Sequence, residues 1–404
     1  YGHGLTVIHG AFGIYDVLPL PYLLGLQAVS SSPIYDEAEN TSVAKGSFPL
    51  NGFAGFTPPV RAIYTPRTPG RNYVMQYTFN VQQQFAKSTQ LTVGYIGSHG
   101  VRQPFTVNDM NFVLPVADSP VGYVWPKSGT APKLNPSIGT ESGTFFEGSS
   151  IYNSLQASLK YNSVRIQGML SYTWSRSIDD SSSALSGASF DNSIANPPYF
   201  DIRLNRGLSD FDVRNLVSAY AMAVLPSPSA HFGAWASPLR GWNLENIFSI
   251  SGGVPFTPTV GGDPLGSLSS SAFDRPNLVS KTGCTQPENV KYLNTACFAF
   301  PSTYEYSPGL FGPVLGNAGR NPIVGPGIFF WTTGLMNEQK FGERMRMELE
   351  AQAFNVTNRP NFEDPQSTQA QIFNVSGQLL STAGQLSVTS TSSRQLQFSL
   401  KLLF

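Results

Sequence analysis

Few residues in this sequence have the types and the spacing that an active site requires. The four histidines are His3, His9, His99 and His231, and no two of them have the spacing of metal ligands. The sequence has no HExxH zinc motif, no GxSxG nucleophile elbow, no phosphate-binding P-loop and no GxGxxG fingerprint between a strand and a helix. The sequence therefore predicts no catalytic, metal or cofactor site, and we expect a protein that is not an enzyme.

Two acidic segments are the strongest remaining candidates for chemistry. Asp179 and Asp180 could act as a general acid and base. Adjacent acids followed by serines are more typical of a solvated loop at a strand end, and we favour that interpretation. Asp210 and Asp212 could bind Ca²⁺ through their carboxylates. We favour a structural role for them, in which they accept backbone hydrogen bonds in a turn and pair with Arg214.

The two cysteines, Cys284 and Cys297, lie close together in a stretch rich in Gly, Pro and Asn. This arrangement predicts one local disulfide in an oxidising compartment. The alternative is a pair of unrelated thiols. Because the CxxC spacing is absent, we do not expect a zinc or redox site.

Composition narrows the class of protein. Lys plus Arg and Asp plus Glu both number 25, so the net charge is zero and nothing indicates a nucleic-acid partner. Charged residues make up 12% of the chain and aromatic residues another 12%. No apolar run is long enough for a transmembrane helix. Two classes remain, namely a secreted, loop-rich β protein and a membrane barrel whose apolar surface is spread over alternating strands.

The last residues of the chain alternate most regularly between apolar and polar side chains. Gln395, Gln397, Ser399 and Lys401 share one face, and Leu403 is the only exception to the pattern. A strand of this kind separates two different solvents, so we expect the apolar face to contact lipid. That face consists of Leu396, Phe398, Leu400, Leu402 and Phe404.

A second strand, predicted over 344–355, places its charges on one side only. Met345, Met347 and Leu349 occupy the opposite side. We expect the charges to face a barrel lumen, where they could line a substrate path or hold a plug domain. Alternatively, they form a salt-bridged wall that needs no ligand. These predicted lumen-facing charges are Arg344, Arg346, Glu348 and Glu350.

Period-2 alternation recurs along the whole chain and predicts about ten long strands. Short turns and long loops alternate between them. In outer-membrane barrels the short turns lie on the periplasmic rim and the long loops outside. If the last strand runs inward, every long loop falls outside. The predicted strands are 5–17, 72–84, 89–97, 152–161, 164–176, 212–225, 241–251, 328–340, 344–355 and 395–404. The predicted short turns are 85–88, 162–163, 226–240 and 341–343.

Several motifs, in this order, resemble the Oar-like group of TonB-dependent outer-membrane receptors. The resemblance extends from about residue 72 to the end of the chain. The segments that carry it are Val93 to Ser98, Ser171 to Asp180, Ser209 to Arg214, Gly241-Trp242 with Ser251 to Thr257, Gly316 to Asn321 with Gly325 to Gly327, and Glu350 to Phe362.

The resemblance implies an all-β, antiparallel transmembrane barrel of about 22 strands, of which residues 1–404 would form the last ten. It implies TonB-driven uptake of a bulky nutrient such as a siderophore or an oligosaccharide. The plug and the N-terminal domains would lie outside this chain. Implied partners are outer-membrane lipid, the barrel assembly machinery, which would recognise the strand ending at Phe404, and the TonB complex through the plug. A porin-like channel without a plug and a secreted, soluble β-rich binding protein remain as alternatives.

Overall fold

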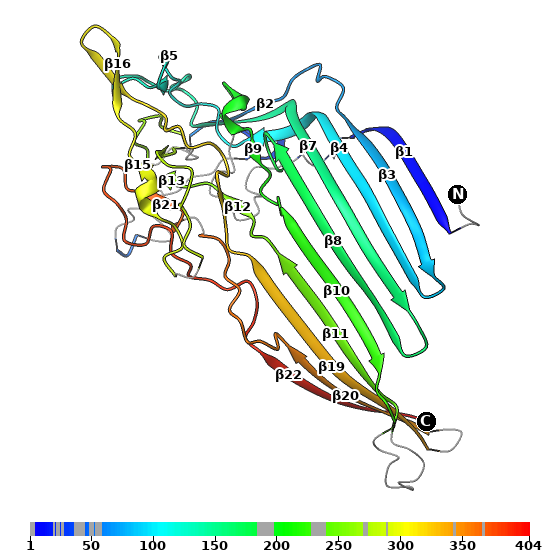
Figure 1. Cartoon of the computed structure of the whole chain (residues 1–404). Helices are drawn as coiled ribbons and strands as arrows, with labels where there is room; N and C mark the ends of the chain where they lie inside the picture. Colours follow the sequence, from blue (N-terminus) through cyan, green and yellow to red (C-terminus); the bar gives the residue numbers. More distant parts are fainter. Residues whose placement is uncertain are drawn as a thin grey trace.

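The computed structural model describes residues 5–18, 21, 25, 28–35, 45–47, 52, 59–183, 198–227, 240–269, 274–287, 290–341, 345–365 and 368–404. Its dominant feature is one antiparallel sheet of long strands (Figure 1). Among the described residues, no helix is long and apolar enough to cross a membrane. The long strands are β1 (Thr6–Asp16), β3 (Tyr73–Ala86), β4 (Thr89–Val107), β7 (Thr140–Asn162), β8 (Ile166–Asp179), β10 (Asn215–Val224), β11 (Trp242–Ser251), β19 (Ile328–Phe341), β20 (Met345–Phe354) and β22 (Gln395–Leu403).

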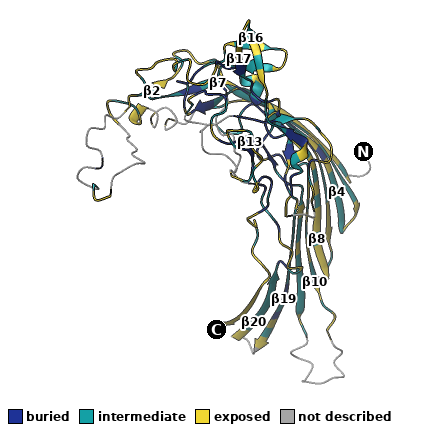
Figure 2. Ribbon diagram, turned by 90° about the vertical axis from the view of Figure 1, so that its left-hand side faces the viewer, coloured by how far each residue is buried: buried dark blue, intermediate teal, exposed yellow. Residues whose placement is uncertain are grey.

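The long strands form a meander, in which each strand pairs with the next long strand along the chain. The sheet is strongly curved but open (Figure 2). Within the described part of the chain, β1 pairs only with β3, and β22 pairs only with β20. The expected all-β antiparallel architecture is therefore confirmed, whereas the ten strands do not close on themselves into a barrel.

Short turns and long connections alternate along the meander. Because neighbouring strands are antiparallel, all long connections therefore lie at the same end of the sheet. The described residues of these connections are called the loop cap (Figure 1). The loop cap contains only short elements. These are β2 (Arg61–Tyr64), β5 (Ala117–Ser119), β6 (Gly122–Val124), η1 (Ile202–Asn205), β9 (Gly207–Leu208), β12 (Pro255–Phe256), β13 (Thr259–Val260), β14 (Asn277–Leu278), η4 (Thr295–Cys297), β15 (Phe298–Ala299), β16 (Thr303–Ser307), β17 (Leu310–Pro313), β18 (Ile323–Val324) and β21 (Gln371–Phe373).

Strand register aligns the apolar side chains of neighbouring strands on one face of the sheet. Leu91 of β4 faces Leu159 of β7, which faces Leu170 of β8. Further along the sheet, Phe248 of β11 faces Trp331 of β19, and the two rings stack with centroids 5.2 Å apart. Because side chains alternate across a strand, a shift of one residue would move each apolar set to the other face. The register therefore extends the apolar pattern of single strands into one continuous surface.

The apolar core of the molecule lies in the loop cap and not between layers of sheet (Figure 2). One cluster centres on Phe256, Leu293 and Ile372, which belong to the connections that follow β11 and β20. A second cluster centres on Trp125 and Phe112, and the Trp125 indole Nε1–H donates to the carbonyl of Val113 at 2.6 Å. The long connections are therefore packed structure with their own interior.

Each of the ten predicted strand ranges overlaps one long strand, but two strands are much longer than expected. β4 and β7 continue past the other long strands and pair with each other, after register shifts between Gly100 and Pro104, and the start of β7 also pairs with β2. Arg102 adopts a positive φ of 54° at this irregularity. β10 begins at Asn215, later than expected, because the amide of Asp212 closes a turn onto the carbonyl of Ser209. The predicted turns over 226–240 and 341–343 lie mostly outside the described residues.

Candidate functional site

A buried arginine, Arg320, joins three segments of the chain. They meet at the end of β8 that is nearest the loop cap. The Arg320 side chain is 1% exposed, and its Nη1 and Nη2 atoms donate to Asp179 Oδ1 at 2.7 and 2.5 Å. Nη2 also lies 3.3 Å from Asp210 Oδ1. The guanidinium further donates to the carbonyls of Asn205 and Leu208. One side chain therefore connects the end of β8, the η1–β9 region and the loop before β18.

Tight backbone packing accompanies this polar cluster. Asn321 adopts a positive φ of 54° and donates through Nδ2 to Asp210 Oδ1 at 2.8 Å. Gly207 approaches the same loop so closely that a Cβ atom there would lie 2.3 Å from the carbonyl oxygen of Arg320. A side chain at this position would push the two segments apart. The Arg320 cluster thus depends on a glycine as well as on its charges.

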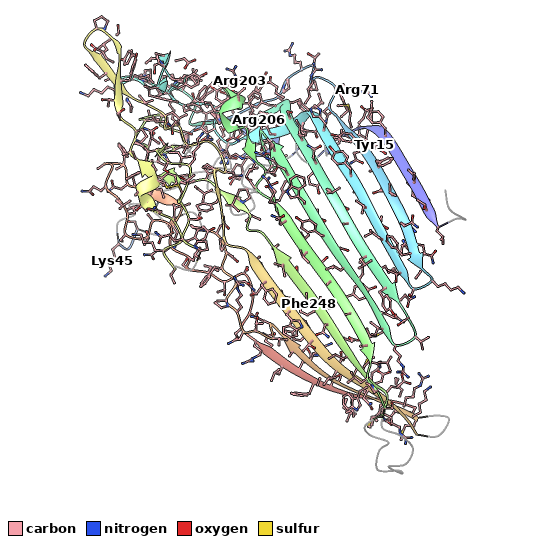
Figure 3. The ribbon with its side chains drawn as sticks, in the orientation of Figure 1. Tyr15, Lys45, Arg71, Arg203, Arg206 and Phe248 are labelled. Carbon is pink, nitrogen blue, oxygen red and sulfur yellow. A yellow bond between two sulfur atoms is a disulfide. The ribbon has the colours of Figure 1, made fainter. Side chains whose placement is uncertain are left out.

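Asp179 and Asp180 are buried, so the expectation of a solvated loop at this position was wrong. Asp179 is 2% exposed and Asp180 is 6% exposed. The Asp180 carboxylate accepts from the amide of Ser149 at 2.9 Å and from Arg206 at 3.0 Å. Buried carboxylates require such donors. The two acids are therefore structural anchors that tie β8 to the loop cap, and Figure 3 shows Arg206 at this end of the sheet.

Asp212 ties the start of β10 to β8. Its Oδ1 accepts a hydrogen bond from the backbone amide of Ser177, with nitrogen and oxygen 2.5 Å apart. Burial raises the pKa of the Asp212 carboxyl above its usual range. The hydroxyls of Ser177 and Ser209 lie 2.7 Å apart beside it. The expectation that this acid accepts backbone hydrogen bonds is met, and Asp210 pairs with Arg320 instead of Arg214. In the described part of the chain, no group of three or more acids, histidines or cysteines could hold a metal ion.

The loop cap also contains a cavity of about 160 Å³ with two buried polar residues in its wall. Asp274 is 3% exposed, its Oδ1 has no hydrogen-bond partner, and burial raises its pKa to about 8. Burial also lowers the pKa of the adjacent Arg275 to about 10. Arg275 donates to the Leu204 carbonyl at 2.8 Å and to Asn205 Oδ1 at 2.9 Å. The cavity wall is thereby coupled to the Arg320 cluster through Asn205.

The disulfide lies in the same part of the loop cap. Cys284 and Cys297 are bonded, with Cα atoms 5.7 Å apart. Both side chains are buried in the apolar cluster around Leu293. The bond closes a short loop and anchors it to that cluster.

The polar face of β20 forms salt bridges with its neighbours. Arg346 pairs with Glu338 of β19 at 3.6 Å, and Lys401 of β22 pairs with Glu348 at 3.5 Å. The Ser399 hydroxyl donates to Glu350 at 3.3 Å. These contacts fit the alternative of a salt-bridged wall. Arg344, the remaining predicted lumen-facing charge, lies outside the described residues.

Sequence reasoning assigned no chemistry to Arg320, Arg275 or Asp274, which the structure places at the centre of the loop cap. Arg320 lies within Gly316 to Asn321, one of the segments that carry the family resemblance. That resemblance was the only indication in the sequence that Arg320 has a role. The partners of Arg320 are 110 and 141 residues away in the sequence. Local spacing cannot reveal a contact of this kind.

Comparison with known proteins places this architecture in a family. The family model described as "Outer membrane beta barrel domain" matches residues 2–397. Among solved structures, the outer membrane transporter YddB from Escherichia coli is similar with a TM-score of 0.48 and 11% identity, over 99% of this chain and 38% of that one. The chain thus spans well under half the length of that transporter. No curated protein matches the sequence. The chain belongs to the outer membrane β-barrel domain family and is located in the outer membrane.

Proposed function

We propose that the chain forms the C-terminal part of a TonB-dependent transporter barrel that takes up a bulky nutrient. The observation that carries this proposal is the loop cap. Four of the five long connections at this end of the sheet contribute to the two apolar clusters, and the buried Arg320 joins the connection before β19 to the one that follows β8. A folded cap of this kind offers a fixed recognition surface at the external mouth of a barrel. A channel for passive diffusion would not require such a surface.

The two faces of the sheet support a membrane-spanning orientation. Phe398 and Leu400 expose 77% and 61% of their surface on the apolar face. An apolar surface that runs across all ten strands would cause aggregation in water, whereas in a membrane it contacts lipid. The opposite face carries the Lys401–Glu348 and Arg346–Glu338 pairs and is suited to a hydrated lumen. The loop cap is then external and the short turns are periplasmic.

The free edges of β1 and β22 support a larger barrel. In the part of the chain that the structure describes, each edge presents unpaired backbone groups to its surroundings, and a membrane cannot satisfy them. Additional strands between the two edges would pair both of them, and the wider lumen would accommodate a plug and a bulky cargo. The cargo would be a siderophore, an oligosaccharide or a molecule of similar size.

A conductance experiment on the full-length protein tests this proposal against a porin-like channel. A plugged transporter should give no stable open channel in a planar bilayer, and should open only when urea displaces the plug. Large constitutive conductance of the untreated protein would contradict the proposal and support the porin alternative. The heat-modifiability of the same sample on a gel shows that the barrel is folded.

A TonB-dependent transport assay completes the test. In the native host, loss of this protein and loss of TonB should abolish uptake of the same compound. Uptake that persists without TonB would overturn the TonB-driven part of the proposal. The conductance experiment therefore tests whether the barrel is a plugged transporter or an open channel. The uptake assay tests whether TonB drives the transport.

A further inference from the structure

A second cavity, of about 300 Å³, opens on the apolar face of the sheet near its loop-cap end. Two arginines and two aromatic rings contribute to its wall, and neither the ion pairs of the loop cap nor the polar face of the sheet uses them. The principal lining residues are Tyr95, Asn153, Leu155, Trp174, Arg176 and Arg214.

Register places five of these residues on the same face of three neighbouring strands. Tyr95 of β4 faces Leu155 of β7, which faces Trp174 of β8. In the row nearer the loop cap, Asn153 faces Arg176. The polar row thus lies directly above an apolar row, at the level where the apolar face meets the loop cap.

The cavity is rich in hydrogen-bond donors. The Tyr95 hydroxyl donates to Asn153 Oδ1 at 2.6 Å, so the Nδ2 amide of Asn153 remains as a donor. Arg176 is exposed, and the buried Nε of Arg214 has no hydrogen-bond partner. Neither arginine forms a salt bridge with a carboxylate in the described part of the chain. The Asp212 carboxylate interacts electrostatically with both arginines. Its Oδ1 also accepts a hydrogen bond from the backbone amide of Ser177.

We propose that this cavity binds the phosphate group of a lipid in the external leaflet. Two guanidinium groups beside one buried carboxylate leave a net positive charge, and guanidinium forks match phosphate geometry. The aromatic rings of Tyr95 and Trp174 suit the membrane–water interface, and Leu155 continues into the apolar surface that an acyl chain would follow. This inference rests on the orientation in the proposed function, with the loop cap external.

Lipid retention by the purified full-length protein in detergent tests the site. Native mass spectrometry would compare diphosphorylated lipid A with the same lipid after enzymatic removal of its phosphates. The double variant Arg176→Gln/Arg214→Gln should bind the phosphorylated lipid about tenfold more weakly, since charge-assisted hydrogen bonds to phosphate are lost. Arg165→Gln is the matched control, because Arg165 lies beside the same strand at its short-turn end.

The outcomes separate the possible explanations. Equal retention of both lipids by the wild type, or equal retention of phosphorylated lipid by the wild type and the double variant, would overturn the site. Competition by inorganic phosphate alone at similar concentration would show a free-anion site and would also overturn it. If the double variant loses heat-modifiability, Arg176→Gln alone provides the test, since that side chain is exposed. A constitutively conducting barrel would refute the transporter proposal without altering these lipid results.

Discussion

Replacement of Arg320 by Met should loosen the loop cap while leaving the sheet intact. The Arg320 side chain is 1% exposed, and its removal leaves the Asp179 and Asp210 carboxylates buried without their counter-ion. Loss of one partner of a buried ion pair costs about 3–5 kcal/mol. An opening equilibrium should therefore shift by roughly 10²- to 10³-fold or more. The control is Arg203→Met, because the Arg203 side chain is 84% exposed and solvent screens its pair with Asp201.

Hydrogen exchange of the full-length protein measures this opening. The amide of Ser209, bonded to the Ser177 carbonyl, and the amide of Asn321, bonded to Thr257 Oγ1, should lose protection in Arg320→Met but not in Arg203→Met. The heat-modifiable folded species should persist, since Arg320 meets the sheet at Asp179, the last residue of β8. Addition of Asp179→Asn to Arg320→Met should restore part of the protection by removing the uncompensated charge. Equal protection in the two single variants would refute the assignment of Arg320 as the residue that holds the cap together.

Three further predictions concern the faces, the cavity and the disulfide. Leu400→Arg should cost roughly 2–4 kcal/mol and reduce the folded species on a heat-modifiability gel, whereas Ser399→Arg should assemble normally; equal assembly would contradict the assignment of the faces. Because burial raises the pKa of Asp274 to about 8, its stabilising effect is complete below the unfolded value of about 4 and is lost as the pH rises through 8. Proteolysis of the loop cap should accelerate over that window, and Asp274→Asn should abolish the dependence. Replacement of Cys284 and Cys297 by Ser should lower local stability by about 2–4 kcal/mol; unchanged proteolysis of this loop would count against a stabilising bond.

Long strands were predictable from the sequence because their signal is local. Alternation in 395–404 reflects two solvents on the two sides of one strand, and the same contrast acts on every strand of the sheet. The extensions of β4 and β7 lack that signal. They contain Gly100, Pro104 and Gly148, which indicate loops, yet their backbones pair with each other. Pairing between backbones depends on a partner strand, and a single segment does not reveal its partner.

The interior of the loop cap was not predictable, for a related reason. Asp179 and Asp180 resembled solvated acids because their neighbours in the sequence are serines. Asp179 pairs with Arg320, which belongs to the connection before β19, and Asp180 pairs with Arg206, which lies further along the connection that follows β8. A carboxylate followed by polar residues has the same local pattern whether it is solvated or paired across a loop. Only the spatial convergence of the connections distinguishes the two cases.

The two parts of the molecule are therefore stabilised by different forces. In the sheet, backbone ladders dominate, together with the lipid contact that we propose for the apolar face, so we expect a residue such as Leu400 to matter chiefly through its polarity. In the loop cap, Phe256, Leu293 and Ile372 form an interior without periodicity, and Arg320 and the disulfide connect its segments. Stability in the cap can then change without loss of the barrel. Substitutions that change the surface of the loop cap should therefore leave the sheet intact, because loops tolerate change better than the elements that they connect.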